Sequence, residues 1–171
     1  GWADYDPALI SPGGGVFLRS AKAIAISEPM RKQLGINAEQ LTPNELICAL
    51  LQAPVDLIWN GGIGTYVKSS QQTHAEIGDK ANDGLRVDGG QLRCKIFGEG
   101  GNLGMSQLGR IEYGLTGGAC NTDFIDNAGG VDCSDHEVNI KICLDELMSS
   151  GQLALNDRNE LMRSMTDEVA Q

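Results

Sequence analysis

The sequence lacks long apolar runs and paired cysteines. No apolar stretch approaches the ~20 residues of a membrane-spanning helix, and no basic segment followed by an apolar stretch opens the chain. We therefore expect a soluble protein without an export signal. Its five cysteines are an odd number, are scattered and form no C-x-x-C pair, which argues against a disulfide framework and a zinc site. This pattern favours a reducing compartment, the cytoplasm.

Basic residues are also scarce. The 171 residues include 13 Lys and Arg against 23 Asp and Glu, which gives a net charge of −10. Such a charge repels a phosphate backbone and an anionic membrane surface alike. We expect neither nucleic acid nor a membrane as a partner.

Several motifs of known chemistry are missing. The chain contains no G-x-x-x-x-G-K-[ST], no G-x-S-x-G, no H-E-x-x-H and no EF-hand loop, so P-loop, serine-hydrolase and common metal-site interpretations lose support. It also has no complete G-x-G-x-x-G. Gly98 and Gly100 come closest, but Leu103 stands where the third glycine belongs. The usual diphosphate loop of a dinucleotide-binding domain is therefore absent.

Glycine is what the chain has in excess. It has 23 glycines, about twice the ~7% average share, and 41% apolar residues typical of one globular domain or a piece of a larger one. Glycine allows close approach of the backbone to a ligand, so clusters at strand ends suggest a cofactor crevice; tight turns alone are the alternative. The clusters are Gly13–Gly15, Gly61–Gly64, Gly98–Gly101, Gly117–Gly118 and Gly129–Gly130.

Strand and helix patterns alternate along the chain. We expect irregular structure over residues 1–20, an α/β part over 21–130 and C-terminal helices over 131–171, together forming a single domain. Ser27 with Gly35, and the capping box that starts at Thr42, delimit two early helices. The remaining expectations are strands over 21–26, 55–59, 92–97 and 120–125, and helices over about 72–85, 105–115, 131–150 and 156–169, with Asn156 as the last cap.

This alternation predicts an α/β fold, an incomplete Rossmann-like doubly wound sheet that is mainly parallel and has helices on its faces. Parallel strands connected by right-handed crossovers end at one edge of the sheet. The glycine-rich loops that start near Asn60, Gly98 and Asn127 should therefore converge there. Ligands bind at this edge in open α/β sheets.

Polar groups from Asn127 to Glu137 lie beside a predicted helix start, where free amides favour an anion such as a carboxylate. Ser134 is the candidate ligand; simple helix capping by Asp132 or Ser134 is the alternative. His136 has acidic neighbours, but consecutive helical residues point apart, so we expect no metal site. We expect the cysteines to be buried apolar residues, and Met105, Met148, Met162 and Met165 to fill helix contacts.

Three long strings carry a resemblance to a known family. They are Val55 to Lys68 (VDLIWNGGIGTYVK), Gly98 to Gly104 (GEGGNLG) and Asn127 to Lys141 (NAGGVDCSDHEVNIK), supported by Trp2 to Asp6 and Ile10 to Phe17. Together they resemble the large bacterial NAD-specific glutamate dehydrogenases along essentially the whole chain.

The resemblance implies NAD as the cofactor. It implies that Asn127 also lies near the substrate and that Ser134 meets the distal carboxylate of glutamate. Asp132, Asp135 and His136 around Ser134 differ from the residues that small glutamate dehydrogenases carry at these positions. The detail of the substrate pocket therefore stays open. The cofactor-binding residues that it implies are Asn60, Gly61, Gly62, Glu99, Gly100, Gly101, Asn102 and Asn127.

The implied reaction is oxidative deamination of L-glutamate to 2-oxoglutarate and ammonium. Family members are far longer, and their diphosphate loop, catalytic lysines and catalytic aspartate precede the part that matches Gly1. The resemblance therefore implies an inactive fragment of a homo-oligomeric enzyme, with no catalytic residue of its own. A noncatalytic domain that senses a nucleotide or an amino acid, and a purely structural module, remain alternatives from the residues alone.

Overall fold

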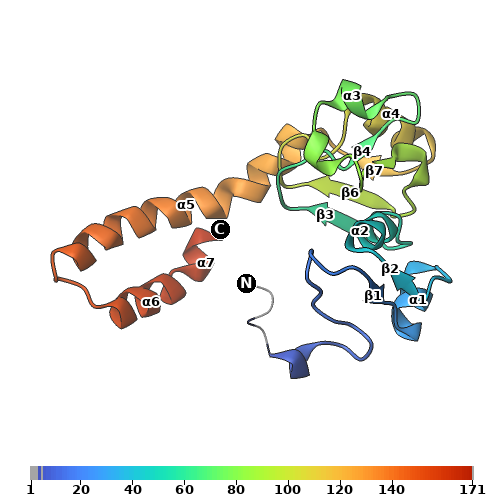
Figure 1. Cartoon of the computed structure of the whole chain (residues 1–171). Coiled ribbons are helices and arrows are strands. Elements are labelled where there is room, and N and C mark those ends of the chain that lie inside the picture. Colours follow the sequence, from blue (N-terminus) through green and yellow to red (C-terminus); the bar gives the residue numbers. More distant parts are fainter. Residues whose placement is uncertain (1–3, 5, 171) are drawn as a thin grey trace.

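The computed structural model describes Asp4 and residues 6–170. Figure 1 shows an α/β body, a smaller N-terminal part beside it and a helical arm that extends away from both. The sequence predicts irregular structure over residues 1–20. Of these, residues 1–3 and 5 lie outside the described part. Residues 6–20 contain short turns and the 3-10 helix η2 (Pro7–Leu9). No helix among the described residues has the length and apolarity to cross a membrane.

The N-terminal part is a strand pair with two helices. Strands β1 (Ile24–Ala25) and β2 (Gln40–Leu41) pair antiparallel. Helix α1 (Glu28–Leu34) starts at the cap Ser27 and ends at Gly35, which has φ 66°. Helix α2 (Pro43–Leu51) has the complete Thr42–Glu45 capping box, so both predicted helices are confirmed. Their apolar sides share a core formed by Ile24, Ile26, Leu34, Leu46 and Ala53.

The central sheet confirms the predicted parallel α/β architecture. Strands β3 (Leu57–Asn60), β6 (Ile96–Glu99) and β7 (Ala119–Cys120) lie in the order β3-β6-β7, and both pairs are parallel. Helix α4 (Gln107–Leu115) packs against β7, as expected for a helix over 105–115. The main core, which includes the predicted Met105, consists of Val67, Val87, Leu92, Cys94, Phe97, Met105 and Tyr113.

The face of the sheet that points away from this core is open. Leu57, Trp59 and Ile96 project from it, and each side chain is about half exposed. The Trp59 indole covers Gly98 and Gly100: a Cβ atom would lie 2.5 Å from the indole at Gly98 and 2.4 Å at Gly100. In the described part of the chain β3 pairs with β6 alone, so β3 is an edge strand.

A second parallel pair, β4 (Val67–Lys68) with β5 (Val87–Asp88), was not expected from the sequence. The helix predicted over 72–85 between them is wrong. The structure has only α3 (His74–Ile77) and the 3-10 helix η3 (Lys80–Asn82), followed after β5 by η4 (Gly89–Gln91).

Tertiary contacts break that helix. Gly78 adopts φ 76° and ends α3. The fully buried Arg86 side chain then donates to the Thr65 and Asp79 carbonyl oxygens at 2.8 and 2.6 Å and pairs with Asp83 at 2.7 Å. These bonds fold the segment back onto the loop after β3. A continuous helix over 72–85 could not form these Arg86 bonds.

Three strand predictions are also wrong in extent. The strand expected over 21–26 covers only Ile24–Ala25. β6 begins at Ile96 instead of Leu92, because the first backbone bond to the neighbouring segment is from Lys95 N to Val55 O. The strand expected over 120–125 ends at Cys120, since helix α5 (Asp123–Ser149) begins three residues later. Residues 127–130 are therefore helical and do not form a glycine turn.

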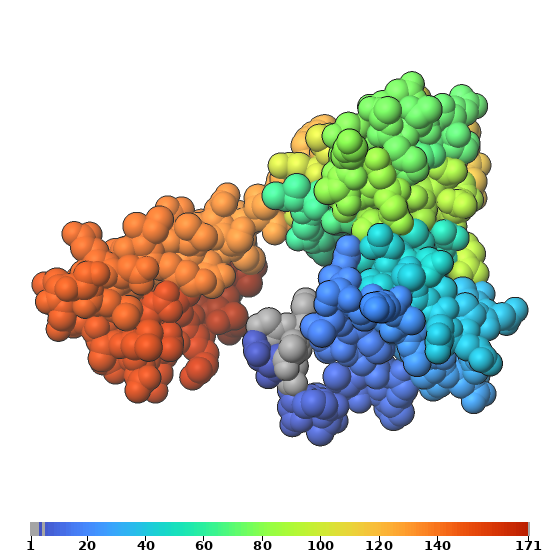
Figure 2. Space-filling model, viewed as in Figure 1, coloured from blue at the N-terminus to red at the C-terminus, as the bar shows by residue number. Residues whose placement is uncertain are grey.

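The C-terminal arm consists of α5, α6 (Leu155–Ser164) and α7 (Thr166–Val169). The orange and red atoms in Figure 2 stand apart from the body and join it through the start of α5. The N-cap of α6 is Ala154, so the prediction of Asn156 as the cap is wrong. The single helix expected over 156–169 is interrupted at Met165, where α6 ends and α7 follows.

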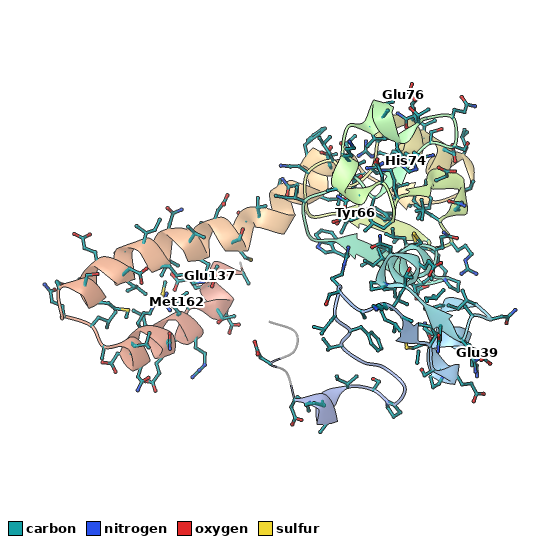
Figure 3. The ribbon with its side chains drawn as sticks, in the orientation of Figure 1. Glu39, Tyr66, His74, Glu76, Glu137 and Met162 are labelled. Atoms are coloured by element: carbon teal, nitrogen blue, oxygen red, sulfur yellow. The ribbon has the colours of Figure 1, made fainter. Side chains whose placement is uncertain are left out.

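Two of the three methionines of the arm, Met162 and Met165, pack between its helices, as predicted. Met148, Met162 and Met165 are half-buried. Met162 projects toward Glu137 of α5 (Figure 3), and both side chains line a cavity of about 360 Å³ between α5 and the α6–α7 pair. The expectation that the cysteines are buried is wrong for two of the five, because Cys133 and Cys143 are exposed on α5.

The Glu112 side chain links α4 to the loops next to the β4–β5 sheet. Its carboxylate accepts hydrogen bonds from Ser69 Oγ at 2.7 Å, from Ser70 N and Oγ at 2.8 and 2.9 Å, and from Gly90 N at 2.9 Å. Burial raises the pKa of Glu112, but the hydrogen bonds from Ser69, Gly90 and Ser70 together outweigh it and lower this pKa to about 2.

We expect Glu112→Gln to lower the free energy of unfolding at pH 7 by roughly 1–3 kcal/mol, because an amide loses acceptors for these donors. A lowered folded-state pKa stabilises above the unfolded value of 4.5, and this stabilisation is lost as pH falls toward about 2. Urea unfolding from pH 7 to pH 2 should therefore show the two proteins converging in acid. Glu160→Gln, an exposed change on α6, is the control; a pH-independent difference for Glu112→Gln contradicts the prediction.

Candidate functional site

The carboxyl ends of β3 and β6 lie next to each other. Asn60, the last residue of β3, is in register with Glu99, the last residue of β6. The loops that follow are in backbone contact, since a Cβ atom on Gly101 would lie 2.5 Å from the Gly62 carbonyl oxygen. The glycines of these two predicted loops thus permit the convergence that the sequence suggested.

The third converging element is helix α5 instead of a loop. A Cβ atom on Gly130 would lie 2.7 Å from Gly100 Cα, so the helix backbone rests directly on the β6 loop. One turn earlier, Asn127 Nδ2 donates to Asn102 Oδ1 at 2.9 Å. The convergence at Asn60, Gly98 and Asn127 is found, but a helical surface provides its third part.

The Asn102–Asn127 pair offers hydrogen-bonding groups to solvent. Asn102 is exposed and Asn127 is half-buried. Their mutual bond uses Asn102 Oδ1 and Asn127 Nδ2, which leaves the Asn102 amide group as a donor and Asn127 Oδ1 as an acceptor. Such a pair can bind a group that has both a donor and an acceptor, for example a carboxamide or a hydroxyl.

The β3 loop adds backbone and one buried donor. Gly61 and Gly62 are exposed, and a Cβ atom on Gly62 would meet nothing within 4 Å, so there is open space beside it. Asn60 Nδ2 is buried and has no hydrogen-bond partner among the described residues. Unpartnered buried donors are rare in folded proteins. The open backbone turn at Gly61 and Gly62 fits a polar cofactor, whereas Asn60 Nδ2 packs against Gly104.

Glu99 points into the protein, away from this surface. Its side chain is fully buried: Oε1 accepts from Arg110 Nη2 at 2.7 Å, and Oε2 accepts from Met105 N at 3.0 Å. Burial raises the pKa of Glu99, and Arg110 together with the Met105 amide opposes that shift. The carboxylate therefore holds the end of its own loop. Gly100 and Gly101 are likewise buried, so within Glu99 to Asn102 the exposed side chain is that of Asn102.

Ser134 lies well inside α5, and its Oγ donates to the Val131 carbonyl oxygen at 2.8 Å. The expectation of an anion at a helix start near residues 127–137 is wrong, because the amides there are already bonded within the helix. Capping by Asp132 or Ser134 is equally wrong, since Thr122 is the N-cap. Ser134 follows Asn127 by seven residues, so both lie on one helix face about 10 Å apart.

The structure adds residues to the site that sequence reasoning missed. Asp123 Oδ2 accepts from Leu103 N at 2.9 Å, and Asp126 Oδ2 accepts from Glu99 N at 3.1 Å. Thr122 followed by Asp123 is the available sequence signal, because a threonine cap and acidic residues in the first turn mark helix starts.

His136 does not build a metal centre. Its Nε2 lies 3.9 Å from Asp132 Oδ1, one turn away on α5. In the part of the chain that the structure describes, no three His, Cys, Asp or Glu side chains gather to hold a metal ion.

Comparison with known proteins decides the family. The family model described as "Bacterial NAD-glutamate dehydrogenase, catalytic domain" matches residues 1–171. The chain belongs to this family. It is 68% identical over 168 residues to the NAD-specific glutamate dehydrogenase of Pseudomonas aeruginosa, and 61% identical over 170 residues to that of Halomonas elongata. The Mycobacterium tuberculosis relative is 54% identical over 176 residues.

These alignments cover nearly all of this chain but a small part of each relative. They include 98% of the chain for the Pseudomonas protein and 99% for the other two. The chain spans about a tenth of the length of these glutamate dehydrogenases, namely 10%, 10% and 11%. The family resemblance drawn from the three sequence strings is thereby confirmed.

Gly130 and Gly129 give a matched test of the helix-to-loop contact. We expect Gly130→Ala to destabilise the chain by roughly 1–3 kcal/mol, because its methyl group would overlap the Gly100 backbone. Gly129→Ala has open space and should stabilise by up to about 1 kcal/mol through helix propensity. Urea unfolding of both variants measures the difference. Equal effects of the two substitutions contradict the described contact.

Proposed function

We propose that this chain is the later part of the nucleotide-binding domain of an NAD-dependent glutamate dehydrogenase. The proposed parent oxidises L-glutamate to 2-oxoglutarate and ammonium. Family membership and three relatives named NAD-specific glutamate dehydrogenase support this assignment. Because the chain spans about a tenth of those relatives, we assign the reaction to the parent enzyme and no catalytic residue to this segment.

The exposed Asn102–Asn127 pair at the carboxyl end of the parallel sheet carries the cofactor part of the proposal. Bound NAD supplies the acceptor for the hydride that leaves glutamate. Asn102 would bind the nicotinamide ribose, and Asn127 the nicotinamide and the nearby substrate. Gly61, Gly62 and Asn60 would contact the cofactor through the β3 turn, while Glu99, Gly100 and Gly101 give the Asn102 loop its packed shape.

Ser134 is the proposed contact for the distal carboxylate of glutamate. It is exposed and lies on the same face of α5 as Asn127, two turns further along. Its hydroxyl can donate to a carboxylate after giving up the weak bond to Val131 O. Substrate would then lie along the surface of α5.

The setting of the parent follows from charge and cysteine chemistry. All five cysteines are free, which suits a reducing compartment, so we propose a cytoplasmic enzyme of glutamate catabolism. The net charge of −10 disfavours nucleic acid and anionic membranes as partners. The resemblance implies a homo-oligomeric parent, and the unpaired edge of β3 suits pairing with a further strand of that parent.

Asn102→Ala in the full-length parent tests the cofactor contact. Loss of one hydrogen bond should raise the KM for NAD about two- to tenfold and leave the KM for glutamate nearly unchanged. Initial-rate kinetics with each substrate varied in turn make the measurement. Asn139→Ala is the control, because that exposed side chain bonds only to Asp135 O on the same helix. An unchanged KM for NAD in Asn102→Ala rules out the proposed contact.

Ser134→Ala tests the substrate contact in the same enzyme. Loss of a donor to a carboxylate should raise the KM for glutamate by about tenfold or more, with little change for NAD. Ser149→Ala is the matched control, since its Oγ makes the same kind of intrahelical bond, to Asp145 O at 2.8 Å. If both variants behave alike, Ser134 does not contact substrate.

A further inference from the structure

Three carboxylates hold the loop that carries Asn102. Asp126 accepts from the amide of Glu99 at the start of the loop, and Asp123 accepts from the amide of Leu103 in its middle. The Glu99 carboxylate accepts from the amide of Met105 at its end. Asn102 therefore lies between backbone positions that are fixed by side chains.

The conformation of this loop needs such support. Leu103 has φ 55°, and it is the single non-glycine residue with a left-handed backbone in the described part of the chain. Side chains other than glycine rarely adopt this region because of steric strain. The Asp123 carboxylate bonds to the amide of this same residue. Loss of that bond should let the neighbouring Asn102 move.

Simple capping of α5 does not account for the two aspartates. Both lie in the first turn, where acidic residues favour the helix dipole. Their described hydrogen bonds, however, go to Leu103 N, Glu99 N and Asn121 Nδ2, and none goes to an amide of α5. The carboxylates reach across to the β6 loop instead.

Arg110 offsets part of the negative charge of this cluster. Its Nη2 lies 2.7 Å from Glu99 Oε1 and 3.9 Å from Asp123 Oδ1, and its side chain is 11% exposed. The Arg110 guanidinium thus links Glu99, whose carboxylate binds the end of the loop, to Asp123, whose carboxylate binds its middle. Such networks fix geometry more strongly than separate pairs.

We propose that Asp123 and Asp126 are positioning residues for the cofactor site: they fix the Glu99–Met105 loop so that Asn102 is held against Asn127. This inference rests on the proposed function, which makes Asn102 a cofactor contact. Neither aspartate touches the cofactor in this account. Both act through the loop backbone, and Asp123 acts next to Asn102 itself.

The test uses the full-length parent enzyme and initial-rate kinetics. Asp123→Ala should raise the KM for NAD about two- to tenfold and by no more than Asn102→Ala does, with kcat at saturating NAD within about twofold of wild type. Asp123→Asn keeps an oxygen that can accept from Leu103 N and should restore the KM for NAD to near wild type. Glu146→Ala is the control, an exposed carboxylate on the same helix without a partner among the described residues. Loss of kcat with an unchanged KM for NAD indicates a merely structural role and overturns the proposal.

A double variant tests the route through Asn102. If Asp123 acts by holding Asn102, then Asp123→Ala should add less than twofold to the KM for NAD of Asn102→Ala, because the contact it supports is already gone. Fully multiplied effects overturn the proposal. Asp126→Ala serves if Asp123→Ala does not fold: it removes the acceptor for Glu99 N and should couple to Asn102→Ala in the same way.

The outcomes separate this inference from the function on which it rests. An unchanged KM for NAD in Asn102→Ala means that the proposed cofactor contact fails, and the positioning role fails with it. An impaired Asn102→Ala beside unaffected Asp123→Ala and Asp126→Ala overturns the positioning role alone and leaves the cofactor contact standing.

Discussion

Direct backbone contact at the carboxyl end of the parallel sheet is the constraint on which the rest of the site depends. Gly101 lies against the Gly62 carbonyl group, and Gly130 of α5 lies against Gly100. A methyl group at Gly101 or Gly130 would overlap main-chain atoms that cannot turn aside. These glycines bring two loops and a helix within hydrogen-bonding distance, and the Asn102–Asn127 pair is a consequence.

Ion pairs and hydrogen bonds then hold the loops and the helix whose close approach the glycines permit. The buried Glu99 is compensated by Arg110, and Asp123 and Asp126 bind amides of the same loop. Buried carboxylates need such partners, because desolvation of an unpaired charge is costly. The buried carboxylates of the site are therefore all paired or hydrogen-bonded, while its outer surface offers neutral amides and open backbone. This division suits a region that orients a cofactor and leaves proton transfer to other groups.

Local signals predicted the elements they govern directly. The Ser27 and Thr42 caps and the alternation of parallel strands with helices are confirmed, since each depends on neighbours in the sequence. Prediction failed where distant contacts compete with local preference. The expected helix over 72–85 is broken by the bonds of buried Arg86, and Gly129–Gly130, which suggest a turn, are held in α5 by packing on the β6 loop.

The sequence by itself determined the parallel α/β class, the family and the set of glycine-rich strings that meet at one sheet edge, because these follow from periodicity and from residue identity. Only the tertiary structure decided that Glu99 points inward, that Asn127 and Ser134 share a helix face, and that Asp123 and Asp126 hold the Asn102 loop. The direction of a side chain and the partner of a backbone amide depend on which segments pack together, and separation along the chain does not encode that.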